Sequence, residues 1–255
     1  MSFQEPPQWD DDPLSELFKM AEYNERVTSL NHPTVFELLK GVQRTFKEVQ
    51  NAVEHDSKPE LLIPRFLIAR TISSFFAAIR LAMSGQIAEA FPILRQAIEQ
   101  AWYALHIAKD PSAPSRMEVW LNRNDDAEAK LKCKQEFTIA NVRATHEALD
   151  PYTARHLQGL YESVIDYGAH PNQLGVLIGI AHSKGEKKID YKVGIIYPET
   201  LSMMVTVRLA VAVAVGALKV FQRIFSERFE IVSIDNKIEG LVVQLNSVFK
   251  PYLQK

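Results

Sequence analysis

The pattern of apolar and polar positions predicts helices along almost the whole chain. Its clearest stretch runs from Ser57 to Asp110, where apolar residues recur three and four positions apart over two long segments. Gly85 separates the two segments, at a point where a tight connection would reverse the chain. Ser57 and Glu60 have the spacing of a capping box in front of the first segment. We therefore expect two long helices packed back to back, with the rest of the chain organised around them.

Similar periodicity predicts further helices on both sides of this pair. The expected N-caps are Asp12 before Pro13, Asn31 before Pro33 and Asp150 before Pro151. Asp125 or Asp126 is the expected N-cap of a helix over residues 126–149. Pro64 and Pro92 lie inside the two central patterns, so we expect each helix to start late or to kink there. A final helix is expected over residues 234–250.

Residues 174–197 carry the strand signal of the chain, as two β-rich runs around residues 183–186. We therefore predict an all-α fold, a multi-helix bundle of about eight helices with one small β-hairpin inserted near residues 174–197. The acidic, proline-bearing residues 1–12 are expected to form a disordered tail. Residues 13–255 are expected to form a single helical domain with its core over residues 57–228.

Composition narrows the classes of protein that fit this pattern. The chain has 255 residues, 47% of them hydrophobic, which is enough for one large core. A formal net charge of −2 gives no overall field toward nucleic acid or an acidic membrane, although a local basic groove stays open. The single cysteine, Cys133, excludes an internal disulfide and a cysteine-cluster metal site. The N-terminus has neither the basic start nor the apolar core of a signal peptide, so we expect a cytoplasmic protein.

Residues 201–218 form an apolar run that is about long enough to span a bilayer. Arg208 lies near its middle, and a charge there costs about 2.5–3.5 kcal/mol on insertion scales. We therefore interpret the run as a buried core helix and expect no contact with a membrane. Its small residues near Ala210 to Ala217 are also a candidate surface for pairing two copies in a homodimer.

The common catalytic and nucleotide-binding motifs are missing from the sequence. It contains no Gly-x-x-x-x-Gly-Lys-Ser/Thr, no Gly-x-Gly-x-x-Gly after a strand, no His-Glu-x-x-His and no Gly-x-Ser-x-Gly. Seven histidines are scattered without the spacing of metal ligands, so we predict no metal and no cofactor. His146, His156 and His182 are expected at the surface or in turns.

One group of polar residues needs an explanation, because it lies on the mostly apolar second helix of the central pair. At about 100° per residue, Arg95, Glu99 and His106 fall within roughly 40° of one another. A polar line on a mostly buried helix needs partners. Pro171 disfavours helical geometry at the residue before it, so the imidazole of His170 is expected at or just beyond a helix C-terminus.

We take Arg95, Glu99 and His170 as candidate catalytic residues. The candidate ligand-binding neighbours are Arg70, Tyr161 and Asn172. In a structural interpretation, Glu99 neutralises Arg95, and His170 or Tyr161 completes the hydrogen bonds that a buried ion pair requires. In a functional interpretation, Arg95 binds an anionic group such as a phosphate while His170 acts as an acid or base near neutral pH. The sequence leaves both interpretations open.

Two stretches of the chain, RTISSFFAAIRLAMSGQIAEAFPILRQAIEQAWYALHI and the later YESVIDYGAHPN, carry a resemblance. Together they resemble an uncharacterised bacterial all-helical family that is distantly similar to HEPN-type nucleotidyltransferase-partner and ribonuclease domains. The resemblance covers about residues 60–225. In such proteins an Arg-x-x-x-Glu on one core helix faces a His at the end of another, and the matching positions are Arg95, Glu99 and His170. Active HEPN-type ribonucleases also carry an Arg followed by a His four to six residues later on one helix, and no expected helix here has that pair.

Two classes of function follow from these observations. The first is a soluble helical binding or regulatory protein of unknown ligand, which the resemblance links to bacterial defence or stress. The second is a metal-independent, HEPN-like ribonuclease or phosphodiesterase that uses Arg95 and His170. A homodimeric scaffold is a third expectation. Whether the protein is an enzyme stays open, and nucleic acid is a partner that the net charge does not indicate.

Overall fold

Helices make up almost all of the architecture, as the apolar periodicity predicts. The computed structural model describes residues 9–54, 56–111, 115–171, 173–177, 180–184, 189–197 and 200–253. The longer helices are α1 Pro13–Asn31, α2 Pro33–Glu54, α3 Leu62–Ser84, α4 Ile87–Ala108, α8 Pro151–Val164, α10 Leu201–Ile224 and α12 Ile234–Leu253. The shorter ones are α5 Ser115–Leu121, α6 Ala127–Glu136, α7 Ile139–Leu149, α9 Gln173–Leu177 and α11 Ser226–Ile231. Single turns are the 3-10 helices η1 Pro59–Leu61 and η2 Asn122–Asn124 and the π-helix η3 Ile165–Ala169, and the strands are β1 Ile180–Lys184 and β2 Ile189–Val193.

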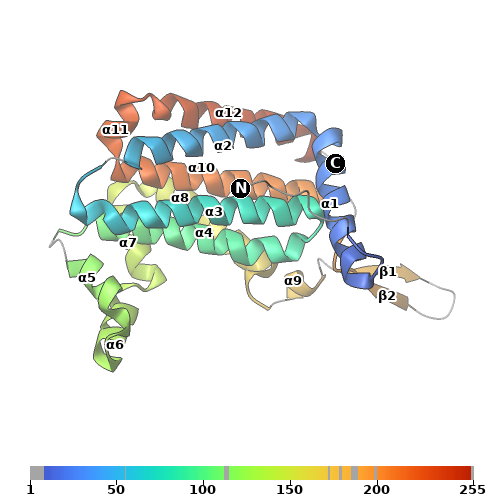
Figure 1. Cartoon of the computed structure of the whole chain (residues 1–255), viewed down its shortest axis with the longest axis horizontal. Coiled ribbons are helices and arrows are strands. Elements are labelled where there is room, and N and C mark those ends of the chain that lie inside the picture. Colours follow the sequence, from blue (N-terminus) through green and yellow to red (C-terminus); the bar gives the residue numbers. More distant parts are fainter. Residues whose placement is uncertain are drawn as a thin grey trace.

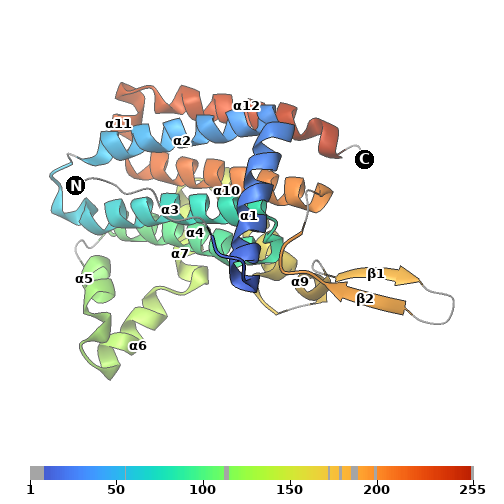
Figure 2. The same ribbon diagram turned by 45° about the vertical axis from the view of Figure 1, so that its right-hand side comes forward.

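The long helices lie roughly side by side in a bundle. Helices α2 and α12 pack against each other and cover one side of α10, while α3 and α4 pack on its other side (Figure 1). Helix α1 crosses one end of the bundle, near the strands β1 and β2 (Figure 2). Helices α5 and α6 project as an arm from the opposite end (Figures 1 and 2). The bundle thus carries a projecting segment at each end.

Helix α10 lies at the centre of the bundle and accounts for the most apolar run of the sequence. Among the described residues, the segments 59–84 and 201–224 are long and apolar enough to cross a membrane. Length and composition alone are weak evidence that a helix spans a membrane, because the core helix of a soluble protein has both properties. In the second segment, 78% of the most apolar 18-residue stretch is buried inside the protein. Residues 210–217 are all buried, so the surface that the sequence offered for a homodimer faces the monomer's own core.

The N-caps at Asp12, Asp126 and Asp150 are confirmed, whereas the capping box is wrong and Asn31 is the last residue of α1. Each capping aspartate accepts a backbone N–H from the first turn of its helix: Asp12 from Leu14 at 2.9 Å, Asp126 from Ala129 at 2.7 Å and Asp150 from Thr153 at 3.1 Å. Helix α3 begins at Leu62, after η1, and not at the expected Ser57–Glu60 box. The side chain that accepts a hydrogen bond there is Asp56, from the backbone N–H of Lys58 at 3.0 Å.

The expected number of about eight helices is too low, because some predicted helices are divided. The helix expected over residues 126–149 is α6 followed by α7. Thr138 caps α7 by accepting the N–H of Asn141 at 3.2 Å. The side-chain amide of Asn141 in turn donates to the carbonyls of Gln135 and Glu136 at 2.9 and 3.1 Å, which closes the end of α6. Periodicity alone does not reveal such a side-chain stop.

The segment predicted as a β-hairpin, residues 174–197, contains both strands and part of a helix. Strands β1 and β2 are antiparallel, with Ile180 opposite Val193 and Lys184 opposite Ile189. Helix α9 occupies the start of the predicted range. Most of the predicted disordered tail, residues 1–8 of 1–12, lies outside the described residues.

Prolines affect the helices less than the sequence suggests. Helix α3 does start late, two residues before Pro64, but Pro92 lies inside an α4 that continues to Ala108. Helix α12 likewise runs to Leu253 and contains Pro251 in its last turn.

The reversal between α3 and α4 takes place at Gly85, as predicted. Gly85 has a φ of 93°, in the left-handed region that favours glycine. Its carbonyl accepts the backbone N–H of Tyr197 at 3.0 Å. The side-chain amide of Asn24 donates to the carbonyls of Ser84 and Tyr197, each at 3.0 Å. This turn therefore ties α1 and the segment after β2 to the central helix pair.

Candidate functional site

Four of the predicted site residues come together on one side of α4: Arg95, Glu99 and His170, with the predicted neighbour Tyr161 from α8. Nε of Arg95 donates to Oε1 of Glu99 at 2.8 Å, and the Tyr161 hydroxyl donates to the same oxygen at 2.9 Å. The guanidinium carbon of Arg95 also lies 5.7 Å from the centre of the Tyr161 ring, within the range of a cation–π contact. Nη1 of Arg95 lies within hydrogen-bonding distance of Nε2 of His170. We call Arg95, Glu99, Tyr161 and His170 the arginine cluster.

The position of His170 follows from the way α8 ends. The helix continues into η3, where Gly168 has a φ of 135° and turns the chain. The Tyr167 ring stacks on Phe91 of α4, with 5.6 Å between ring centres, and this holds the turn against α4. His170 itself has extended backbone and an exposed side chain. The prediction that His170 lies just beyond a helix C-terminus is confirmed.

The arginine cluster is only partly buried. The side chains of Arg95 and Glu99 are 25% and 28% exposed. Partial burial disfavours the charged guanidinium, but the hydrogen bond and charge of Glu99 outweigh it and raise the pKa of Arg95. Burial and the hydrogen bond to Glu99 raise the pKa of Tyr161 to about 12. Tyr161 therefore keeps its proton at neutral pH and serves as a fixed donor.

Two of the predicted neighbours do not join this cluster. Arg70 is exposed on α3, and within the described part of the chain it has no hydrogen bond or ion pair with the cluster. Asn172 lies outside the described residues. The ligand-binding role expected for Arg70 thus has no support in the geometry.

Next along α4, a buried pair joins Trp102 to a histidine of α7. Nε1 of Trp102 donates to Nδ1 of His146 at 3.1 Å, and His146 is fully buried. The expectation that His146 is a surface or turn residue is wrong, because α7 packs its inner face on α4. Burial lowers the pKa of His146 to about 4, with the nearby Asp150 opposing the shift. His156 is exposed as expected, and the side chain of His182 lies outside the described set.

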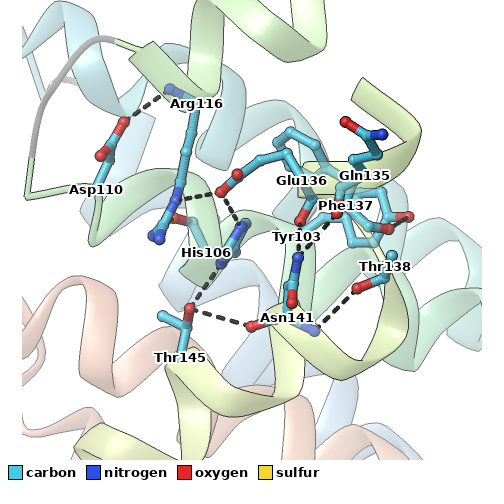
Figure 3. Close-up of polar contacts among 10 residues, drawn as sticks. All are labelled: Tyr103, His106, Asp110, Arg116, Gln135, Glu136, Phe137, Thr138, Asn141 and Thr145. Carbon is cyan, nitrogen blue, oxygen red and sulfur yellow. Dashed lines mark hydrogen bonds and ion pairs between the residues drawn. The ribbon is translucent and has the colours of Figure 1, made fainter. Parts of the chain in front are cut away.

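A second polar network surrounds His106, further along α4 (Figure 3). Nδ1 of His106 lies 2.6 Å from the Thr145 hydroxyl, and Nε2 lies 3.1 Å from Oε1 of Glu136. Arg116 donates to the same Glu136 oxygen at 2.9 Å and to the His106 carbonyl at 3.0 Å. Its backbone N–H donates to Asp110 at 2.7 Å. Burial, with the charge of Arg116, lowers the pKa of the His106 ring, so a neutral ring that donates from Nε2 fits these contacts.

The polar line of α4 is thus partnered along its length, by α8 and the segment after η3 at Arg95 and by α6 and α7 at His106. The sequence indicated that such partners were needed, but it identified only those of Arg95 and Glu99. The partners of Trp102 and His106 could not be found from motifs, because they lie on helices whose packing the sequence does not specify. Within the described residues, no three His, Cys, Asp or Glu side chains converge to hold a metal ion.

Comparison of this chain with protein families, with curated proteins and with solved structures found no match. The function is therefore argued from the arginine cluster itself.

Proposed function

We propose that this protein binds a phosphate-bearing ligand at Arg95 and His170 and acts as a soluble binding or regulatory protein. One observation supports the proposal above all: Glu99 holds Arg95 through Nε, while Nη1 faces the exposed His170. A guanidinium that is fixed at one nitrogen presents its remaining N–H groups in a fork suited to phosphate oxygens. The orientation is set before the ligand arrives, which lowers the entropy lost on binding.

The hydrogen-bond donors of the cluster also favour an anion. Glu99 offsets the charge of Arg95, but its carboxylate accepts from that guanidinium only through Nε, so the Nη groups can still donate. A bound phosphate would accept hydrogen bonds from Nη1 of Arg95 and from the His170 ring that lies beside it.

Binding fits the cluster better than catalysis does. Cleavage of a phosphodiester by an internal hydroxyl requires that a proton leave the nucleophile and that a proton reach the leaving oxygen. The pKa of Tyr161 is raised to about 12, and its proton is held by Glu99. His170 is then the one side chain of the cluster left to exchange a proton with the substrate. A single exchanging group makes the cluster a weak catalyst.

A metal-independent, HEPN-like ribonuclease or phosphodiesterase is the second candidate. The closeness of Arg95 Nη1 to His170 Nε2 favours it, because a phosphate stabiliser would stand beside a proton acceptor. In that reaction the 2′-oxygen of RNA would bond to phosphorus while His170 takes the hydroxyl proton. The bond between phosphorus and the 5′-oxygen would break as that oxygen receives a proton from water. The proposed link to bacterial defence or stress and the proposed cytoplasmic location rest on the resemblance and on composition.

A short single-stranded RNA carrying a fluorophore, in buffer with EDTA, tests both candidates together. Anisotropy should report binding to the wild type, and gel analysis of the same samples should show intact RNA. Arg95→Gln should weaken binding by about tenfold or more, since it removes charge-assisted hydrogen bonds. Arg155→Gln is the matched control, because Arg155 is an exposed α8 arginine outside the cluster, and it should change affinity by less than about twofold. Cleavage of the RNA that depends on His170 would favour the enzyme. An equal loss of RNA binding in Arg95→Gln and Arg155→Gln would contradict both proposals.

A further inference from the structure

A separate cavity lies where the projecting arm meets the bundle. It has a volume of about 190 Å³ and lies between α4, the α5–η2 segment and α6. The lining residues are Tyr103, Trp120, Arg123, Lys130, Cys133, Lys134 and Phe137. None of these belongs to the arginine cluster.

Positive charge converges on this cavity without acidic partners. Arg123, Lys130 and Lys134 line it, and across the described ranges none of the three has a carboxylate within ion-pair distance. The acidic residues of the same arm are Glu118, Asp125, Asp126, Glu128 and Glu136, and none of them is a lining residue. Glu136 is paired with Arg116. Lys130 and Lys134 are four residues apart on α6, so they share one helix face. Three unpaired cations beside one cavity favour an anionic ligand.

The floor of the cavity is aromatic and apolar. Tyr103 and Phe137 pack with 5.2 Å between ring centres, and the Tyr103 hydroxyl donates to the Phe137 carbonyl at 2.9 Å. Trp120 adds a half-buried indole, and Cys133 is buried. These side chains offer apolar contact to a ring, while the cations lie on the exposed parts of η2 and α6.

The cavity wall is fixed by the network around His106 (Figure 3). Glu136, at the end of α6, is held by His106 and Arg116, and Asn141 closes the turn that carries Phe137. The arm is therefore anchored to α4 at the side of the cavity where Tyr103 and Phe137 meet. A wall held in this way is preorganised for a ligand.

We propose that this cavity binds a small aromatic anion, with its phosphate or carboxylate group on Arg123, Lys130 and Lys134 and its ring against Trp120, Tyr103 and Phe137. The size of the cavity suits a single ring with one charged group and not a larger ligand. This site is independent of the arginine cluster, so either proposal can fail without the other.

Isothermal titration with phenyl phosphate, and with its two halves inorganic phosphate and phenol, tests the proposal. Phenyl phosphate should bind at least about tenfold more tightly than inorganic phosphate or phenol. Inorganic phosphate lacks the contacts of the ring, and phenol lacks those of the phosphate. Arg123→Gln and Lys130→Gln should each weaken its binding by about tenfold. Lys132→Gln is the matched control, because Lys132 is exposed on α6 but does not line the cavity. It should leave the affinity within about twofold.

The reactivity of the single cysteine, Cys133, reports whether the ligand lies in this cavity. Cys133 lines the cavity, and burial raises the pKa of its thiol, so its reaction with a thiol reagent is followed in mildly alkaline buffer. Saturating phenyl phosphate should slow that reaction several-fold. The proposal is overturned if phenyl phosphate does not bind below about 10 mM. It is equally overturned if Lys132→Gln weakens binding as much as Lys130→Gln, or if bound ligand leaves the Cys133 rate unchanged.

Discussion

Tyr161 donates its hydroxyl hydrogen to Oε1 of Glu99 at 2.9 Å, the same oxygen that accepts Nε of Arg95 at 2.8 Å. One carboxylate oxygen therefore joins α8 to α4 and orients the arginine of the candidate site. The side chain of Glu99 is 28% exposed, so solvent screens part of this interaction.

Glu99→Gln tests how much this shared oxygen contributes to stability. The amide keeps an oxygen acceptor but loses the charge, so we expect the free energy of unfolding to fall by about 1–2 kcal/mol in urea. Glu89→Gln, an exposed change on the first turn of the same helix, should alter it by less than about 0.5 kcal/mol. A loss of about 3–5 kcal/mol would be that of a fully buried ion pair and would contradict the partly exposed geometry.

The buried pair of Trp102 and His146 predicts a loss of stability in acid. The unfolded His146 ring binds a proton as the pH falls below its ordinary pKa of 6.5, whereas the folded ring, with a pKa of about 4, stays neutral. Stability should therefore decrease between about pH 6.5 and pH 4, by about 3 kcal/mol from this group alone. Urea unfolding across this range measures the slope.

His146→Gln isolates that contribution, because glutamine does not titrate there. The variant should lose less stability than the wild type between the same two pH values, whatever its stability at neutral pH. Burial also lowers the pKa of His106, so some slope should remain. Parallel curves for wild type and variant would contradict the burial-induced shift of His146.

Two glycines, Gly85 in the turn after α3 and Gly159 within α8, should respond in opposite ways to substitution by alanine. A Cβ at Gly85 would lie 2.1 Å from the carbonyl oxygen of Tyr197, and the positive φ adds strain, so Gly85→Ala should destabilise by about 2 kcal/mol or more. Gly159 lies within α8 with no atom near its Cβ position, and Gly159→Ala should stabilise by about 0.5–1 kcal/mol. Thermal unfolding of both variants checks the pair, and a neutral Gly85→Ala would contradict the clamp by Tyr197.

Local patterns predicted several of the local features, although not the start of α3. Asp12, Asp126 and Asp150 cap helices, and Gly85 reverses the chain, because each effect involves residues only a few positions apart. The ends of α6 and α7 were missed, since the stop depends on the side chain of Asn141 reaching back across the turn.

In the candidate site, too, contacts within one helix were predicted and most contacts between helices were not. The pairing of Arg95 with Glu99 follows from i,i+4 spacing on one helix, and that of Arg95 with His170 was suggested only by resemblance. Trp102 with His146 and His106 with Glu136 lie on separate helices, and nothing in their spacing brings them together. Arg70 does not join the cluster, because its position along α3 does not determine which helix its side chain faces.

The most direct test of the central claim is a nuclear magnetic resonance titration of ¹⁵N-histidine-labelled protein with inorganic phosphate near neutral pH. The account predicts that the ring signals of His170 shift saturably as phosphate binds and that Arg95→Gln abolishes the shift, while the buried His146 is unaffected. Unchanged His170 signals up to about 10 mM phosphate, or an equal shift in Arg95→Gln, would contradict a phosphate site at Arg95 and His170.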